Sequence, residues 1–221
     1  MKTFHFISVI PEVFDPYANA SILGRAQKKK LIRIKAHNLR RWANDKHGTV
    51  DDRPYGGGPG MVLKVGPIMK AVQFVKTTIK RSKKGKKTRV ILLSTRGRRF
   101  TQKEAKRLSR YDHLVFICGR YEGVDERVAE HIADEELCVG DAIISGGEVP
   151  AMMIADAVAR MVPGVLGKHE SLEELKGSYP VYTRPEEFVA GKGRRRWRVP
   201  KALLSGDHKV IKEWRKKHGS K

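Results

Sequence analysis

The stretch VFICGRYEGVDERVAEHIADEELCVGDAIISGGEVPAMMIADAVAR, residues 115–160, decides the fold of this chain. It opens with the apolar run Val115–Cys118, which has the length and β-branched content of a buried strand. A second short apolar run, Ala142–Ile144, predicts another strand. Pro150 fits the first turn of a helix over residues 151–161. Strands that alternate with helices indicate an α/β fold with a mainly parallel sheet.

Both predicted strands end in loops that contain glycine. Gly119 follows the first strand, and Gly146 and Gly147 follow the second. Ligands of open α/β sheets bind at the carboxyl ends of strands, and glycine lets the backbone come close to a ligand. The charged residues Glu122 and Arg160 bracket the region. Tight turns alone would explain the glycines, but two such loops joined to charged residues favour a ligand site.

The flanking sequence predicts the remaining elements. Expected strands cover residues 3–10, 31–37 and 89–93, and expected helices cover 20–29, 65–79, 101–109 and 203–215. Thr101 and Glu104 have the spacing of a capping box at the start of one helix. The loop NDKHGTVDDRPYGGGPGM, residues 44–61, holds five glycines and two prolines. A loop of this length in a compact domain is usually functional or disordered.

The charge of the chain limits the class of partner. Lysine and arginine number 46 against 24 acidic residues, which leaves a net charge of +22. Such a charge favours a polyanion, with nucleic acid as the first candidate and a solvated basic surface as the alternative. Two cysteines in apolar contexts indicate reduced thiols. No membrane span or signal peptide is predicted, so we expect a cytoplasmic protein.

The C-terminal part carries the densest basic cluster, GKGRRRWR at residues 191–198. Arginines around Trp197 can hold a phosphate backbone and stack a base, and a disordered basic tail is the alternative. The substrate-RNA contacts expected here are Arg194, Arg195 and Arg196. The change in composition after Arg160 predicts a first domain over residues 1–162, a mobile linker over 163–181 and a small helical domain over 182–221.

A series of motifs in a fixed order goes further than composition. The motifs are DDRPYGGGPGM at 51–61, CGRYEGVDER at 118–127, VGD at 139–141, ISGGEVPAM at 144–152, PGVLG at 163–167, YTRP at 182–185 and VPKALLSGDHKVIKEWR at 199–215. Together they resemble the bacterial tRNA (guanine-N1)-methyltransferase family, TrmD, over nearly the whole chain.

This resemblance implies a SPOUT-type α/β fold with a deep trefoil knot, followed by a shortened helical RNA-binding domain. It also implies a homodimer whose active sites are shared between subunits, and S-adenosylmethionine as cofactor. The cofactor-binding residues it implies are Leu93, Ser94, Thr95, Gly119, Tyr121, Glu122, Val139, Gly140, Ile144, Gly146, Gly147 and Pro150. The chain departs from the family pattern in the first loop at Thr95-Arg96, where Pro-Gln is usual.

The resemblance also implies the reaction, which is methyl transfer to N1 of the guanosine immediately 3′ of the anticodon, position 37 of the tRNA. Arg160 matches the catalytic arginine, and Glu122 matches a glutamate that contacts the guanine, with Mg²⁺ as an optional participant. The family places an aspartate base in the linker. This linker has none, and Glu174 is the nearest positional match, followed by Glu173.

The loop at 51–61 matches the segment that frames the target guanosine, with Asp52, Arg53, Tyr55 and Gly58 as the expected contacts. Two other functions stay open. One is an RNA-binding SPOUT protein with reduced or lost catalysis, and the other is a SPOUT methyltransferase for a different RNA base. Binding of S-adenosylmethionine would separate an enzyme from a pure RNA-binding protein.

Overall fold

The computed structural model describes residues 1–82, 86–166, 178–191 and 195–219. The chain divides into two compact units, Met1–Gly167 and Lys168–Lys221. This division falls within the segment 163–181 that the sequence predicts as a linker, and the exact domain limits stay predictions. In the part of the chain that is described, no helix has both the length and the apolar character needed to cross a bilayer.

The first unit contains the elements β1 (Lys2–Ser8), η1 (Pro11–Phe14), α1 (Asp15–Ala18), α2 (Ser21–Lys28), β2 (Ile32–Asn38), η2 (Leu39–Trp42), β3 (Asp51–Asp52), β4 (Val62–Leu63), α3 (Val65–Ser82), β5 (Thr88–Arg99), α4 (Gln102–Leu108), β6 (His113–Cys118), α5 (Arg127–His131), β7 (Glu135–Cys138) and α6 (Glu148–Ala159). The second unit contains β8 (Glu187–Ala190), β9 (Arg195–Arg198), α8 (Lys201–Leu204) and α9 (His208–His218).

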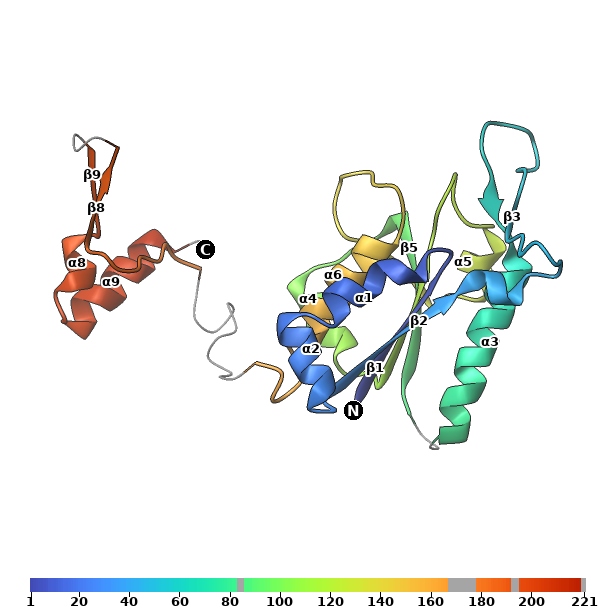
Figure 1. Cartoon of the computed structure of the whole chain (residues 1–221), viewed down its shortest axis with the longest axis horizontal. Coiled ribbons are helices and arrows are strands. Elements are labelled where there is room, and N and C mark those ends of the chain that lie inside the picture. The colour runs from blue at the N-terminus through green and yellow to red at the C-terminus, as the bar shows by residue number, and fades with distance from the viewer. Residues whose placement is uncertain (83–85, 167–177, 192–194, 220–221) are drawn as a thin grey trace. The chain divides into compact units, whose positions relative to one another are not determined.

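A five-stranded sheet in the order β2-β1-β6-β5-β7 forms the centre of the first unit (Figure 1). All of its strand pairs are parallel, as the alternation of strands and helices predicts. The run Val115–Cys118 lies within β6, which is buried along its whole length. Burial on both faces explains why this strand is a continuous apolar run and does not alternate with polar residues.

Helices cover both faces of the sheet. One core cluster joins Phe4 and Phe6 of β1 to residues of α2, α4 and α6. The other joins Ile7 of β1 to residues of α3 and to Val128 of α5. Side chains of a strand alternate between its two faces, so β1 contributes to both cores. Figure 1 shows α2, α4 and α6 on one side of the sheet and α3 on the other.

The prediction of a strand at Ala142–Ile144 is wrong. The strand that precedes α6 is β7, Glu135–Cys138, and residues 142–144 belong to the loop between β7 and α6. Ile143 is 87% exposed and Ile144 is 49% exposed. A short apolar run has the same appearance in a buried strand and in the lining of a pocket, so the sequence pattern alone did not distinguish the two.

Three further details differ from the sequence expectation. The strand expected to end at Leu93 continues to Arg99 after a shift of register against β7. Thr101 is the N-cap of α4, but its side chain makes no capping hydrogen bond. The C-terminal helix expected at 203–215 is divided into α8 and α9 at Ser205-Gly206, where Asp207 caps α9 through the backbone N–H groups of the next turn.

Candidate active site

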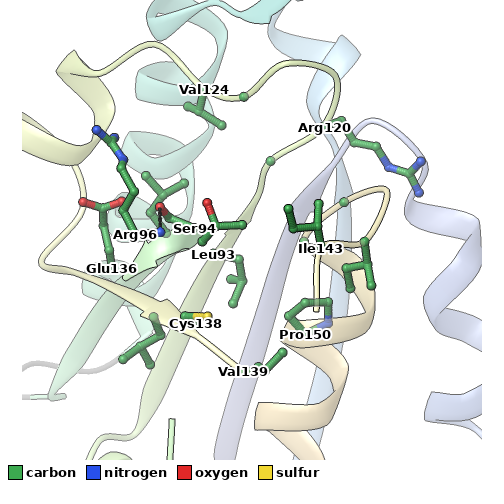
Figure 2. Close-up of a pocket in the computed structure, with 18 of the residues that line it drawn as sticks. Leu93, Ser94, Arg96, Arg120, Val124, Glu136, Cys138, Val139, Ile143 and Pro150 are labelled. Atoms are coloured by element: carbon green, nitrogen blue, oxygen red, sulfur yellow. Dashed lines mark hydrogen bonds between the residues drawn. The ribbon is translucent and has the colours of Figure 1, made fainter. Parts of the chain in front are cut away.

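A pocket of about 510 Å³ lies where three loops of the sheet meet (Figure 2). The loops follow β6, follow β7, and occupy the point where β5 shifts register. Its volume is within the range of about 300–1,000 Å³ that is common for small-ligand sites. The pocket therefore lies at the carboxyl ends of parallel strands, where open α/β sheets bind ligands.

All twelve residues that the sequence comparison with the family suggests for the cofactor line this one pocket. They are Leu93, Ser94, Thr95, Gly119, Tyr121, Glu122, Val139, Gly140, Ile144, Gly146, Gly147 and Pro150. Figure 2 shows Leu93, Val139 and Pro150 around the interior, with Ile143 above Pro150. The structure thus brings the predicted set together, and the binding role of each residue stays a prediction.

The first wall is the part of β5 between Leu93 and Arg98, where the strand leaves its regular pairing with β7. Leu93 pairs with Leu137 of β7, and the ladder resumes only when Arg98 pairs with the same residue. Gly97 allows this close approach, because a Cβ there would lie 2.6 Å from the backbone nitrogen of Leu137. Arg96, which departs from the family pattern, forms an ion pair with Glu126 at the rim of the pocket.

The second wall is the loop after β6, and it is tied to the glycine-rich loop at 51–61. The backbone N–H of Glu122 donates to the carbonyl of Met61 over 3.0 Å. The N–H of Leu63 donates to the carbonyl of Gly123, also over 3.0 Å. The Glu122 side chain lies against Gly60, because a Cβ on Gly60 would overlap it. Tyr121 adopts a positive φ of 59°, which turns the loop around the pocket.

The third wall is the loop that leads into α6. The N–H of Gly147 donates to the carbonyl of Gly119 over 2.9 Å. A Cβ on Gly147 would lie 2.9 Å from the Cα of Cys118. The third loop therefore packs directly on the backbone of β6, and Gly147 is required by packing within the protein.

A buried carboxylate joins the second and third walls. Glu148, the first residue of α6, is 3% exposed. It accepts a hydrogen bond from the Ser8 hydroxyl at 2.6 Å and one from Nε of Arg120 at 3.1 Å. Sequence reasoning missed Ser8, Arg120 and Glu148 as a group. Their positions in the sequence give no signal of it, because Ser8 lies 140 residues from Glu148.

Cys118 is not among the residues that line the pocket. Burial raises the pKa of its thiol well above the ordinary value, and the nearby Glu148 carboxylate acts in the same direction. A thiol that stays protonated is a poor nucleophile. Cys118 and Cys138 are both free cysteines, as the sequence predicts.

The expected RNA-contacting residues of the glycine-rich loop lie on an open surface. Tyr55 is fully exposed, and Gly58 adopts a φ of 119° that favours glycine. Asp52 forms an ion pair with Lys64 at 3.1 Å. The N–H of Arg53, followed by the Lys64 ammonium, lowers the pKa of the Asp52 carboxyl. Asp52 is therefore an anion that anchors the base of the loop.

Arg160 is not part of the pocket within its own chain. It is the C-cap of α6, whereas Gly147 and Pro150 line the pocket at the beginning of that helix. Glu174 and Arg194 lie outside the described residues. Among the residues that are described, no group of three or more His, Cys, Asp and Glu side chains has the geometry to hold a metal ion.

Comparison with known proteins agrees with the geometry. The family described as tRNA (Guanine-1)-methyltransferase TrmD matches residues 1–221. A tRNA (guanine-N(1)-)-methyltransferase of Bacillus subtilis is 46% identical over 217 residues, which covers 96% of this chain and 85% of that protein. The protein of the same description from Carboxydothermus hydrogenoformans is 49% identical, covering 96% of this chain and 80% of its own length.

A solved structure is similar as well. The crystal structure of the tRNA (m1G37) methyltransferase from Aquifex aeolicus superposes with a TM-score of 0.79 at 39% sequence identity. The match covers 96% of this chain and 87% of that chain. Likeness at this level extends over both the sheet with its pocket and most of the remaining sequence.

Proposed function

The chain belongs to the TrmD family of tRNA (guanine-1)-methyltransferases, and from this premise we propose that it methylates N1 of the guanosine immediately 3′ of the anticodon, position 37 of the tRNA. The observation that carries the proposal is the pocket, because every cofactor residue implied by the family motifs lies on its wall. The solved tRNA (m1G37) methyltransferase of Aquifex aeolicus shares the fold.

The residues of the pocket fit S-adenosylmethionine, the methyl donor that the family implies. The apolar side chains of Leu93, Val139 and Ile144 and the loop backbone suit an uncharged adenine ring. Gly140 leaves open space in the third wall, since a Cβ there would meet nothing within 4 Å. S-adenosylmethionine supplies an electrophilic methyl group on a sulfonium centre.

The protein has to remove the proton from N1 of guanine and to stabilise the charge that this removal creates. A carboxylate within hydrogen-bond reach serves the first purpose, and we assign it to Glu174. A cation beside O6 serves the second, and we assign it to Arg160. Glu122, on the second wall, would accept hydrogen bonds from the guanine edge. If the reaction requires Mg²⁺, the Glu122 carboxylate would be the group that contacts the ion.

The glycine-rich loop would frame the target nucleotide. The backbone hydrogen bonds of Met61 with Glu122 and of Leu63 with Gly123 fix one end of the loop to the second wall of the pocket. The exposed Tyr55 and the neighbouring Arg53 are then available to the RNA. A stacking ring and a free cation are the groups that hold an extruded base and its phosphate.

The place of Arg160 supports a homodimer with shared sites. Helix α6 has 12 residues, so its two ends are about 18 Å apart at 1.5 Å per residue. A side chain cannot reach back over that distance to the pocket of its own chain. The catalytic arginine would then come from a second copy.

The surface around α6 supports the same assembly. Val149 and Met153 lie one turn apart on α6 and are 72% and 49% exposed. Val13 of η1 and Tyr17 of α1 are also exposed large apolar side chains, and the Tyr17 hydroxyl donates to Asp156 of α6 at 2.9 Å. Apolar side chains gathered on one surface are typical of protein interfaces. We place this homodimeric enzyme in the cytoplasm, with the segment 163–181 as the connection to the RNA-binding domain.

Methylation of unmodified tRNA transcripts tests the proposal directly. The enzyme should convert a transcript with guanosine at position 37 to 1-methylguanosine, detected by mass spectrometry of the nucleosides. The same transcript with adenosine at that position should remain unmodified. Binding of tRNA without any methylated product, or methylation at another base, would support one of the alternative functions.

A further inference from the structure

The hairpin β8–β9 has two faces of different chemistry. Its register pairs Phe188 with Trp197 and Ala190 with Arg195, so these four side chains share one face. The alternate pairs put Glu187, Val189, Arg196 and Arg198 on the other face. The basic cluster of the sequence is therefore divided between two surfaces.

On the second face, a carboxylate neutralises the arginines. Glu187 forms ion pairs with Arg196 and with Arg198, the latter at 2.6 Å. These two guanidinium groups lower the pKa of the Glu187 carboxyl. Arg196 and Arg198 thus already have an anionic partner within the hairpin.

On the first face, the aromatic rings of Phe188 and Trp197 and the cation of Arg195 are exposed. The Phe188 and Trp197 rings stack with their centroids 5.5 Å apart, yet they remain 52% and 62% exposed. Within residues 178–191 and 195–219, Arg195 has no ion pair with a carboxylate. We call Phe188, Trp197 and Arg195 the aromatic–basic face.

Packing against the described residues of its own unit does not account for this face. Figure 1 shows the hairpin projecting from α8 and α9 of its own unit, and every residue of β9 is exposed. A cross-strand aromatic pair helps to hold a hairpin together, but burial would be the ordinary result for two rings of this size. Rings that remain open beside a cation are the arrangement that receives a nucleic-acid base.

We infer that the aromatic–basic face is a stacking platform for an unpaired nucleotide of the tRNA, distinct from the guanosine that is methylated. Trp197 would stack on the base, Phe188 would support the indole from the neighbouring strand, and Arg195 would contact the adjoining phosphate. The net charge of +22 provides the general attraction to RNA. This inference rests on the proposed function for the identity of the RNA.

An RNA base is favoured over a protein partner by the composition of the face. A protein interface would need apolar area that continues beyond two rings, and the next residues of the same face are Ala190 and a guanidinium. A phosphate adjoining a stacked base matches both components at once. The RNA has to be unpaired there, since a base within a duplex stacks on its neighbours and not on the protein.

The aromatic part is tested by tRNA binding, with the full chain and its unmodified substrate tRNA. Trp197→Leu should weaken binding about 5- to 150-fold, the range measured for loss of one base–aromatic stack. Trp197→Tyr should restore most of the affinity, because it keeps a ring of similar orientation. Thermal unfolding of both variants shows whether the fold is preserved.

The charged part has a matched control on the opposite face. Arg195→Gln should lower the slope of log Kd against log salt by about 0.7, the contribution of one contact to unpaired RNA. Arg198→Gln removes the same charge from an arginine that Glu187 already pairs, so its slope should stay closer to that of the wild type. Equal effects of the two substitutions would overturn the inference, because they would show a diffuse charge effect.

A pair of RNA probes tests whether the nucleotide is unpaired. One is an RNA stem closed by a loop, and the other is the same stem extended as a continuous duplex. Trp197→Leu should reduce affinity for the first and leave the second unchanged. Wild-type affinity of Trp197→Leu for both probes and for tRNA would overturn the inference.

These readouts are independent of the proposed reaction. Trp197-dependent binding without methylation by the wild type would support the platform while contradicting the proposed function. Methylation with Trp197-independent binding would do the reverse.

Discussion

Gly140 and Gly146 line the same pocket but would respond differently to a side chain. A Cβ on Gly140 meets nothing within 4 Å, whereas one on Gly146 would lie 2.6 Å from Nε of Arg120 and from the Glu148 carboxylate. We expect Gly140→Val to fold normally and to weaken S-adenosylmethionine binding about 5- to 150-fold, the equivalent of about 1–3 kcal/mol of overpacking. Gly146→Val should also lower the unfolding temperature.

Calorimetric titration with S-adenosylmethionine and thermal unfolding separate the two effects. An unchanged dissociation constant for Gly140→Val would show that the cofactor does not occupy the space beside Gly140. The structure also changes the reason for a glycine at position 146. From the sequence, the absent side chain leaves room for a ligand, but in the fold the buried pair of Arg120 and Glu148 already fills that space.

Glu148 is expected to position the loops of the pocket. Glu148→Ala would leave the buried Ser8 hydroxyl and Nε of Arg120 without their acceptor, and each unsatisfied buried group costs about 1–3 kcal/mol. Glu148→Gln keeps an acceptor oxygen and should be milder. For the Ala variant we predict a lower unfolding midpoint in urea and a higher KM for S-adenosylmethionine, with a smaller change in kcat. A wild-type KM would contradict this role.

Residues that follow strands were predictable from the sequence, because motif and strand end are close together along the chain. Gly119, Tyr121 and Glu122 come directly after the apolar run of β6, so their place at a sheet edge follows from the strand itself. Ser8 and Glu148 could not be found in this way. Their contact depends on β1 lying beside β6 and on α6 packing across both, which is a property of the tertiary fold.

At the scale of elements, three adjacent strands carry a chain of histidines. Nδ1 of His5 on β1 lies 3.1 Å from Nε2 of His37 on β2, and Nε2 of His5 lies 3.3 Å from Nδ1 of His113 on β6. Burial, followed by the neighbouring His37 and His113 and then by Lys35, lowers the pKa of His5 to about 3. Burial likewise lowers the pKa values of His37 and His113 to about 4.

This chain of histidines makes the fold sensitive to acid. Unfolded histidines titrate near 6.5, so below that pH the unfolded state binds more protons than the folded state. Stability is therefore complete above about pH 6.5 and is lost as the pH falls towards the folded pKa values. Between pH 6.5 and pH 5, His5 alone should contribute a loss of about 2 kcal/mol at about 1.4 kcal/mol per pH unit.

Urea unfolding at pH 7.5, 6 and 5 measures this dependence. His5→Gln keeps a donor and an acceptor but cannot become charged, so its free energy of unfolding should fall less steeply with acid. The exposed His47→Gln serves as the control and should follow the wild type. Equal slopes for His5→Gln and the wild type would contradict the assignment, whatever the absolute stability of the variant.

The length of a sequence pattern determines how well it predicts a helix or a strand. The periodicity of Val65–Ile79 predicted the helix that became α3, because an amphipathic face repeats over several turns. Ala142–Ile144 was too short for any period, and its apolar residues line a pocket instead of a core. Likewise, Thr101 and Glu104 have the capping-box spacing, but the Glu104 carboxylate binds Arg98 and Arg107, both at 2.8 Å.

At the scale of the whole molecule, the proposed active site would draw on a second copy of the chain. The pocket lies at the beginning of α6 and the proposed catalytic Arg160 at its end. The knot and the homodimer that the family resemblance implies stay predictions. The knot depends on the topology of the chain, and the homodimer depends on a second copy. A shared site nevertheless makes a definite prediction about mixtures of inactive subunits.

Arg160→Ala should be defective in the chemical step. Gly140→Val should bind too little cofactor for turnover when S-adenosylmethionine is kept well below the raised dissociation constant of this variant, and all mixtures are assayed under that condition. In a hybrid dimer with shared sites, one site combines Gly140 from one subunit with Arg160 from the other and is intact. The remaining site carries both substitutions. Mixing and refolding the two variants together should therefore restore part of the methyl-transfer rate.

The control is the doubly substituted chain, Gly140→Val with Arg160→Ala, refolded with either single variant. None of these mixtures can form an intact site, so none should gain activity. If Arg160 served the pocket of its own chain, every site in the first mixture would also carry one defect, and its rate would equal that of the separate variants. Recovery in the first mixture alone would therefore require Arg160 to cross from one subunit to the pocket of the other, as its place at the far end of α6 demands.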